Sequence, residues 1–183
     1  SLLKATIIPD TAEERFLSLE IPSPHSDTVV LPTAPSQQSD PEPAPSALQR
    51  VRNEHVLRVG FHADHLPYSF FNDRGHLVGM DVELMHRLAT RLQVRLVFVP
   101  WTFDTVIEQL DRGEFDVVVG GLMVTPERLT QVGFSEPYQT ATLAIALKDD
   151  QRHNVTRWDG LSSDLRLGIV GEELSKAAAR QLP

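Results

Sequence analysis

The sequence predicts an α/β fold with a parallel sheet, and the alternation of two patterns carries that prediction. Short apolar runs rich in β-branched residues, such as VRLVFV at 94–99, have the length of strands. Stretches of helical periodicity, such as 80–93, separate these runs. Strands joined through helices form βαβ units, in which a parallel sheet is covered on both faces.

The helix at 80–93 is the clearest element, because five apolar residues share one helical stripe and acids occupy its first turn. The stripe consists of Val82, Met85, Leu88, Ala89 and Leu92, and the acids are Asp81 and Glu83. Strands are expected at 57–61, 94–99, 116–121 and 165–170. Further helices are expected at 103–113, from Thr125 and at 172–182, with an alternating stretch at 138–148.

The segment GGLMVTPERL, residues 120–129, has an arginine near the start of a predicted helix, where acidic residues are usually preferred. Thr125 and Pro126 start a helix, so Arg128 falls in the first turn, where the helix dipole favours acids. The segment also follows a predicted strand, and parallel sheets bind ligands at the carboxyl ends of their strands. We therefore expect an anion or carboxylate pocket here. A surface ion pair with Glu127, Glu136 or Asp116 is the alternative.

The composition narrows the class of partner. The chain has 183 residues and no cysteine. Its formal net charge of −8 argues against nucleic acid and anionic membranes as partners. Its longest apolar run, VVVGGLMV, is far shorter than the roughly 20 residues of a membrane span. The sequence shows no nucleophile–base pair, phosphate loop or metal set, which argues against an enzyme, and no cofactor is expected.

The first fifty residues differ from the rest. They hold Pro9, Pro22, Pro24, Pro32, Pro35, Pro41, Pro43 and Pro45 among the 13 prolines of the chain and no glycine. We interpret residues 1–50 as a Pro-rich, mostly disordered tether. Within it, TAEERFLSL at 11–19 has the composition of a short helix whose apolar face would need a partner outside this chain.

Four motifs, in this order and spacing, resemble the periplasmic solute-binding proteins that bind polar amino acids. They are PYSF at 67–70, GMDVEL at 79–84, GEFDVVVGGLMVTPER at 113–128 and FSEPY at 134–138. The resemblance covers residues 56–148, with a looser match to 183. It implies two α/β lobes that close like a Venus flytrap: the first lobe at 51–147, and the crossover and start of an incomplete second lobe at 148–183.

The resemblance also implies a ligand site. Arg128 matches the arginine that clamps the ligand's α-carboxylate, and Gly121 matches a position whose backbone contacts the ligand. Phe103 and Tyr68 match an apolar side chain and an aromatic ring of the pocket. Trp101 is expected to pack rather than bind.

Three positions depart from the family pattern. Met123 stands where a serine or threonine usually holds the polar head, His65 replaces an aromatic residue and His62 replaces an aspartate. Glu172 and Glu173 in the second lobe also place charge where the carboxylate would lie. The two histidines suggest pocket-lining or pH-sensing imidazoles. An HxxH metal site lacks a convincing third ligand, so no metal is expected.

The resemblance implies an extracytoplasmic domain that binds an amino acid or related carboxylate for a membrane transporter or receptor, which is attached upstream or associated. It implies binding without catalysis. Two alternatives stay open. One is an enzyme on the same scaffold, similar to cyclohexadienyl dehydratase or joined to a peptidoglycan lytic domain, with His62, His65 or Glu172 as acid or base. The other is an interaction lobe that binds no ligand.

Overall fold

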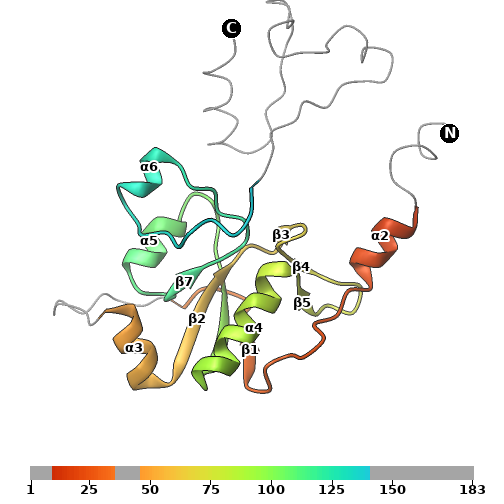
Figure 1. Ribbon diagram of the computed structural model, residues 1–183, viewed down its shortest axis with the longest axis horizontal. Coiled ribbons are helices and arrows are strands. Elements are labelled where there is room, and N and C mark those ends of the chain that lie inside the picture. Colours follow the sequence, from red (N-terminus) through yellow and green to blue (C-terminus); the bar gives the residue numbers. More distant parts are fainter. Residues whose placement is uncertain (1–9, 36–45, 141–183) are drawn as a thin grey trace, which may run out of the picture. The chain divides into compact units, whose positions relative to one another are not determined.

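The computed structural model describes residues 10–35 and 46–140 (Figure 1). Contacts divide the chain into a unit of residues 1–136 and a unit of residues 137–183, and the description below concerns the first. The expected strand and helix at 165–182, the glutamates at 172 and 173 and most of the alternating stretch at 138–148 lie outside the described residues. The domain boundaries at 50/51 and 147/148 stay predictions.

Four parallel strands form the central sheet in the order β1-β6-β2-β7. Their bounds are β1 (Thr28–Val30), β6 (Arg95–Pro100), β2 (Val56–Phe61) and β7 (Val117–Val118). The chain passes from β2 through α4 (Met80–Leu92) to β6, and then through α5 (Val106–Asp111) to β7 on the other side of β2. The predicted parallel α/β sheet is confirmed. The strand order reverses beside β2, which is where ligands bind in such sheets.

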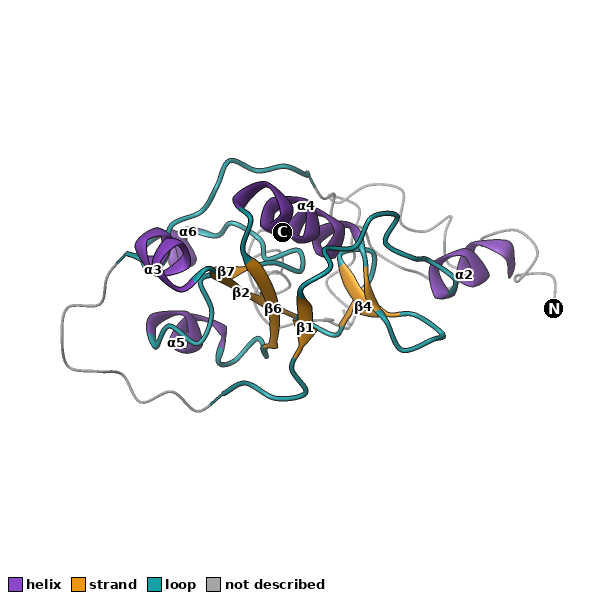
Figure 2. Ribbon diagram, turned by 90° about the horizontal axis from the view of Figure 1, so that it is seen from below, coloured by secondary structure: helices purple, strands orange, loops and turns teal. Residues whose placement is uncertain are grey.

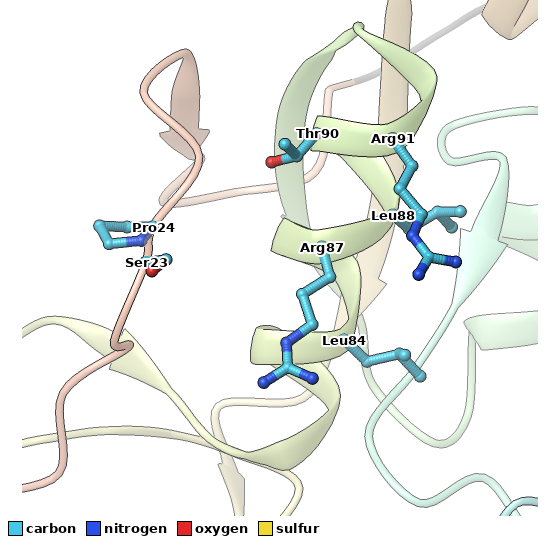
Figure 3. A pocket seen from close by; sticks show the side chains of 7 residues that line it. All are labelled: Ser23, Pro24, Leu84, Arg87, Leu88, Thr90 and Arg91. Carbon is cyan, nitrogen blue, oxygen red and sulfur yellow. The ribbon is translucent and has the colours of Figure 1, made fainter.

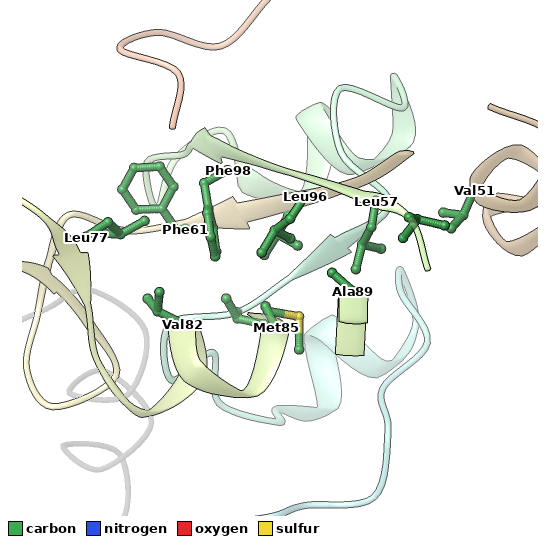
Figure 4. Packing of buried hydrophobic residues seen from close by; sticks show 12 residues of the cluster. Val51, Leu57, Phe61, Leu77, Val82, Met85, Ala89, Leu96 and Phe98 are labelled. Carbon is green, nitrogen blue, oxygen red and sulfur yellow. The ribbon is translucent and has the colours of Figure 1, made fainter. Parts of the chain in front are cut away.

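Helix α4 covers one face of the sheet (Figure 4). Val82, Met85 and Ala89, three residues of the predicted stripe, are buried there. They pack against the alternate residues of β2 and β6 that face this side, namely Leu57, Val59, Phe61, Leu96 and Phe98. Leu92, at the end of the helix, is 41% exposed, so the stripe is buried only where the sheet lies beneath it.

Helix α5 covers the opposite face, and Figure 2 shows α4 and α5 on either side of the strands. Val106 packs there with Val99, Trp101 and Phe115. The helix is shorter than the predicted 103–113, because it begins after Thr105. Phe103 therefore lies in the loop between β6 and α5, not on a helix.

A small antiparallel sheet lies between β2 and α4 in the sequence, formed by β3 (Asp64–His65), β4 (Ser69–Phe71) and β5 (Leu77–Val78). Its loop caps α4. The first two amides of the helix, those of Met80 and Asp81, donate to the carbonyl oxygens of Pro67 and Tyr68, each at 3.0 Å. These hydrogen bonds satisfy donors that a helix leaves unpaired and fix the loop to the helix.

The N-terminal segment, interpreted as a mostly disordered tether, includes two regular elements, and one of them is the short helix anticipated at 11–19. It contains α2 (Asp10–Leu17) and β1, and the helix α3 (Ala47–Glu54) then leads into β2 with Ser46 and Gln49 in a capping box. The partner of α2 lies within this chain, because the Phe16 ring meets Phe70 edge to face at 6.3 Å. The strand β1 is defined by its pairing with β6. It is only three residues long, so its sequence shows no periodicity from which a strand could be predicted.

A buried histidine fastens this segment to α4. The backbone N–H of His25 donates to Nδ1 of His86 at 3.0 Å, and the His25 ring contacts Thr90 Oγ1 at 3.2 Å. His86 also packs edge to face against Phe98 at 5.7 Å. Since Nδ1 accepts a hydrogen bond, the proton of the neutral ring sits on Nε2. Protonation of Nδ1 removes this acceptor.

Acidification is therefore expected to lower the free energy of unfolding through His86. Burial, and then repulsion from His25, lowers the pKa of His86 below 6.5, so below that pH the unfolded state binds more protons than the folded state. The contribution of His86 to stability is fully present above pH 6.5. Below pH 6.5 the free energy of unfolding falls by at most about 1.4 kcal/mol per pH unit, the limit for one proton. Urea unfolding at several pH values measures this slope. His86→Gln keeps an acceptor without titrating, and an unchanged slope in that variant would contradict the prediction.

Candidate functional site

Residues from three strand ends meet at the carboxyl end of the sheet. His62 follows β2, Trp101 and Phe103 follow β6, and Gly120 follows β7. A Cβ placed on Gly120 would lie 3.5 Å from the backbone nitrogen of His62, so the turns after β2 and β7 are in contact. The sequence predicted a ligand pocket at this end of the sheet, and these residues are brought together there.

Five rings form one contiguous group, which we call the ring cluster: His62, His65, Tyr68, Trp101 and Phe103. The ring centroid of His62 lies 5.2 Å from that of Trp101 and 4.9 Å from that of Phe103. His65 lies 5.2 Å from Tyr68 and 6.1 Å from Phe103. The predicted pocket residues Phe103, Tyr68, His65 and His62 thus share one surface.

The ring cluster has a buried floor and an open side. Trp101 is 3% exposed, and its Nε1–H donates to the carbonyl oxygen of Val119 at 3.2 Å, so its predicted packing role is confirmed. Phe103, in contact with it, is 50% exposed. An aromatic face that is held from one side and open on the other suits stacking of a planar or apolar group of a ligand.

The two imidazoles differ in how they hydrogen-bond. Nδ1 of His62 accepts from the backbone N–H of Asp64 at 3.3 Å, which places the proton of the neutral ring on Nε2. Nδ1 of His65 donates to the carbonyl oxygen of Gly120, which leaves Nε2 of its neutral ring as an acceptor. Burial, then repulsion from His65, lowers the pKa of His62, and Asp64 partly offsets this. In their neutral forms the two rings therefore present one donor and one acceptor.

Asp81 is a residue of this site that the sequence interpretation missed. Its carboxylate is fully buried, and Oδ2 accepts from the amides of Gly120 at 2.7 Å and Gly121 at 3.1 Å. The sequence placed Asp81 only as a first-turn acid of a helix. The signal that could have indicated more is its position two residues after Gly79 in the motif GMDVEL.

Arg128 and Met123 form a second group. The helix α6 (Pro126–Leu129) begins as predicted, with Thr125 Oγ1 accepting from the Arg128 amide at 3.3 Å. The Arg128 side chain is buried, at 7% exposed, and Nη1 donates to the carbonyl oxygen of Met123 at 3.1 Å. Asp116, one of its alternative partners, is instead paired with Arg50 at 2.7 Å.

A cavity of about 620 Å³ lies away from these groups, between the flank of α4 and the N-terminal segment (Figure 3). It is lined by Ser23, Pro24, Leu84, Arg87, Leu88, Thr90 and Arg91. None of its lining residues belongs to the ring cluster, and the two arginines are the only ionisable side chains among them. Among the described residues, no group of three or more histidines, acids or cysteines is placed to hold a metal ion.

The model of the bacterial extracellular solute-binding proteins, family 3, matches residues 57–177. The chain belongs to this family. Its fold is that of a lobe of a periplasmic binding protein, and the resemblance stated from the motifs is confirmed. No helix of the described part is long and apolar enough to cross a membrane.

Relatives of this member of the family include proteins named as binding proteins and one named as an enzyme. It is 34% identical over 93 residues to the cyclohexadienyl dehydratase of Pseudomonas aeruginosa, covering 51% of this chain and 35% of the relative. It is 32% identical over 94 residues to ABC transporter arginine-binding protein 1 of Escherichia coli, covering 51% of this chain and 39% of the relative. The chain thus spans only about a third to two fifths of the length of these curated relatives.

A solved structure extends the comparison. The ancestral amino acid-binding protein AncCDT-1, described as a precursor of cyclohexadienyl dehydratase, matches with a TM-score of 0.68 and 36% identity. The match covers 75% of this chain and 61% of that one.

Proposed function

We propose that the carboxyl end of this sheet binds a small amino acid or a related carboxylate without chemical change. The observation that carries the proposal is the ring cluster, with Phe103 half exposed above a buried Trp101. The ligand's side chain lies against Phe103 and Tyr68. His62 and His65 line the same surface and offer it one donor and one acceptor. Membership in a family of solute-binding proteins supports binding as the function of this surface.

In the proposed complex, Arg128 clamps the ligand's α-carboxylate. A guanidinium matches a carboxylate with two parallel hydrogen bonds, and the short helix α6 carries Arg128 in the segment that follows β7 and its two glycines. Gly121 takes part through its backbone, and Met123 narrows the space where a hydroxyl is usual in the family. Both lobes of the whole protein enclose the ligand, which explains why one lobe presents an open surface.

The proposal extends to the whole protein. In extracytoplasmic solute-binding proteins, the domain passes its ligand to a membrane transporter or signals through a receptor. The chain upstream of α2 then links the lobe to an attached or associated membrane protein. Pull-down of a transporter or receptor subunit by the full-length protein in the presence of its ligand tests this extension.

Arg128→Ala is expected to weaken binding roughly tenfold to a hundredfold, because a charge-assisted hydrogen bond contributes about 1.5 to 3 kcal/mol. Calorimetric titration of the full-length protein with L-arginine, L-cystine and L-histidine measures it, after a thermal-shift screen has identified the ligand. Arg91→Ala, on the exposed end of α4, is the matched control and keeps wild-type affinity. An Arg128 variant that binds like wild type would contradict the proposal.

An enzyme on the same scaffold is the second candidate, favoured by the relative that is a cyclohexadienyl dehydratase. His65 is then the acid or base, because neutral Nε2 is an acceptor and the ring lies in the cluster. Turnover of a prephenate-like ring acid by wild type, and its loss in His65→Gln, would favour the enzyme over the binder.

A further inference from the structure

Two consecutive glycines at the end of β7 adopt a conformation that side chains rarely take. The φ angles of Gly120 and Gly121 are +112° and +69°. This turn places the Gly120 carbonyl oxygen against Nδ1 of His65 and places Gly121 against Tyr68. A Cβ on Gly121 would lie only 2.7 Å from the carbons Cδ2 and Cε2 of the Tyr68 ring. The turn thus touches two members of the ring cluster.

One carboxylate oxygen holds this turn. Oδ2 of Asp81 accepts from both glycine amides, and Asp81 itself is fixed by the first turn of α4, where its own amide donates to the Tyr68 carbonyl oxygen at 3.0 Å. Hydrogen bonds from amides to a buried carboxylate are strong, because the acceptor is charged and water is excluded. The helix, the glycine turn and the Tyr68 loop therefore converge on Asp81.

We propose that Asp81 is a positioning residue of the ligand site: by holding the Gly120–Gly121 turn it sets where His65 and Tyr68 stand. The inference rests on the proposed function. Since both amides point to Asp81, they are not donors for the ligand, and the carboxylate of the ligand is left to Arg128. Gly121 then contacts the ligand through backbone atoms other than its N–H group. Asp81 does not itself touch the ligand.

Asp116 offers a matched comparison at the other end of β7. Its side chain is also buried, at 2% exposed, and it accepts from the Arg58 amide at 2.9 Å and pairs with Arg50 at 2.7 Å. It precedes the strand, whereas Asp81 binds the turn that follows it. A merely structural aspartate is expected to behave like Asp116, with loss of stability but without loss of affinity in the folded protein.

The test compares Asp81→Ala, Asp81→Asn and Asp116→Asn in the full-length protein. L-arginine, L-cystine and L-histidine are titrated by calorimetry, unfolding is followed in urea, and amide exchange is measured at Gly120 and Gly121. We expect Asp81→Ala to lower affinity about tenfold to a hundredfold and to speed exchange of both amides. Asp81→Asn retains an acceptor but no charge, so it is expected to fall between. Asp116→Asn is expected to lower stability and leave affinity within twofold of wild type.

Two results overturn the inference. In the first, Asp81→Asn has the same affinity and the same amide exchange as wild type. This measurement can be made even if Asp81→Ala fails to fold. The other is an affinity loss in Asp116→Asn as large as that of the Asp81 variants. Failure of the proposed function looks different: none of the three amino acids binds wild type, or Arg128→Ala binds normally. In the first of these cases, amide exchange at Gly120 and Gly121 still decides whether Asp81 holds the turn.

Discussion

Replacing Gly79 with alanine is expected to lower the free energy of unfolding by about 3 to 5 kcal/mol. Gly79 precedes α4 with φ 133° and ψ 171°, a region of backbone conformation used almost only by glycine. An added Cβ would lie 2.2 Å from the carbonyl oxygen of Tyr68, which accepts the Asp81 amide. The clash is with backbone, so no side-chain rotation relieves it, and the cap of α4 must open. Urea unfolding with linear extrapolation measures the loss.

Substitutions at two other glycines separate the cost of backbone strain from the cost of the steric clash with Tyr68. Gly75 has φ 74° but no atom within 4 Å of an added Cβ, so Gly75→Ala is expected to cost only the left-handed strain, roughly 1 kcal/mol. Gly133 has neither a positive φ nor a close neighbour, and Gly133→Ala is expected to change stability by less than about 0.5 kcal/mol. Equal losses in the Gly75 and Gly79 variants would refute the collision at Tyr68.

Gly121→Ala is expected to reduce ligand affinity by up to about tenfold. Its Cβ requires the Tyr68 ring to move by about 1 Å, and losing the contact of an aromatic ring with the ligand costs about 0.5 to 1.5 kcal/mol. The affinity for the amino acid found in the thermal-shift screen is measured by calorimetric titration. The variant is also expected to lose about 1 to 2 kcal/mol of stability through the left-handed φ of 69° and the displaced ring.

A double-mutant cycle on stability isolates the contact with Tyr68. In a Tyr68→Ala background the ring is absent, so Gly121→Ala is expected to cost only the backbone strain. The two substitutions should therefore be less than additive, by about 0.5 kcal/mol or more. Strict additivity would mean that Gly121 and Tyr68 do not press on one another, and the affinity prediction would then lose its basis.

The sequence predicted those parts of the fold that depend on local periodicity. The stripe of α4 and the short apolar runs of β2 and β6 are each visible within about a dozen residues, and they define the sheet and one of its covers. The family resemblance implied that Phe103, Tyr68, His65 and His62 line one pocket, and the ring cluster contains all four. That Arg128 and Gly121 bind a ligand stays a prediction.

The parts that escaped prediction depend on partners far along the chain. The expected strand at 116–121 shrinks to Val117–Val118, because the next two glycines turn away and give their amides to Asp81, 39 and 40 residues earlier. Asp81 was missed for the same reason, since an acid in a first turn is already explained by the helix dipole. β1 exists only because β6 offers its edge.

The pairing of β1 with β6 has a practical consequence for expressing the lobe. The family match begins at residue 57, and a shortened chain cut at that point would lose β1. The Leu96 amide and the Phe98 carbonyl oxygen, now bonded to Asp27 and Leu31 at 2.9 Å, would then face solvent along a bare strand. An exposed edge strand of this kind can pair with another molecule and cause aggregation, so a soluble recombinant lobe should keep residues 21–35.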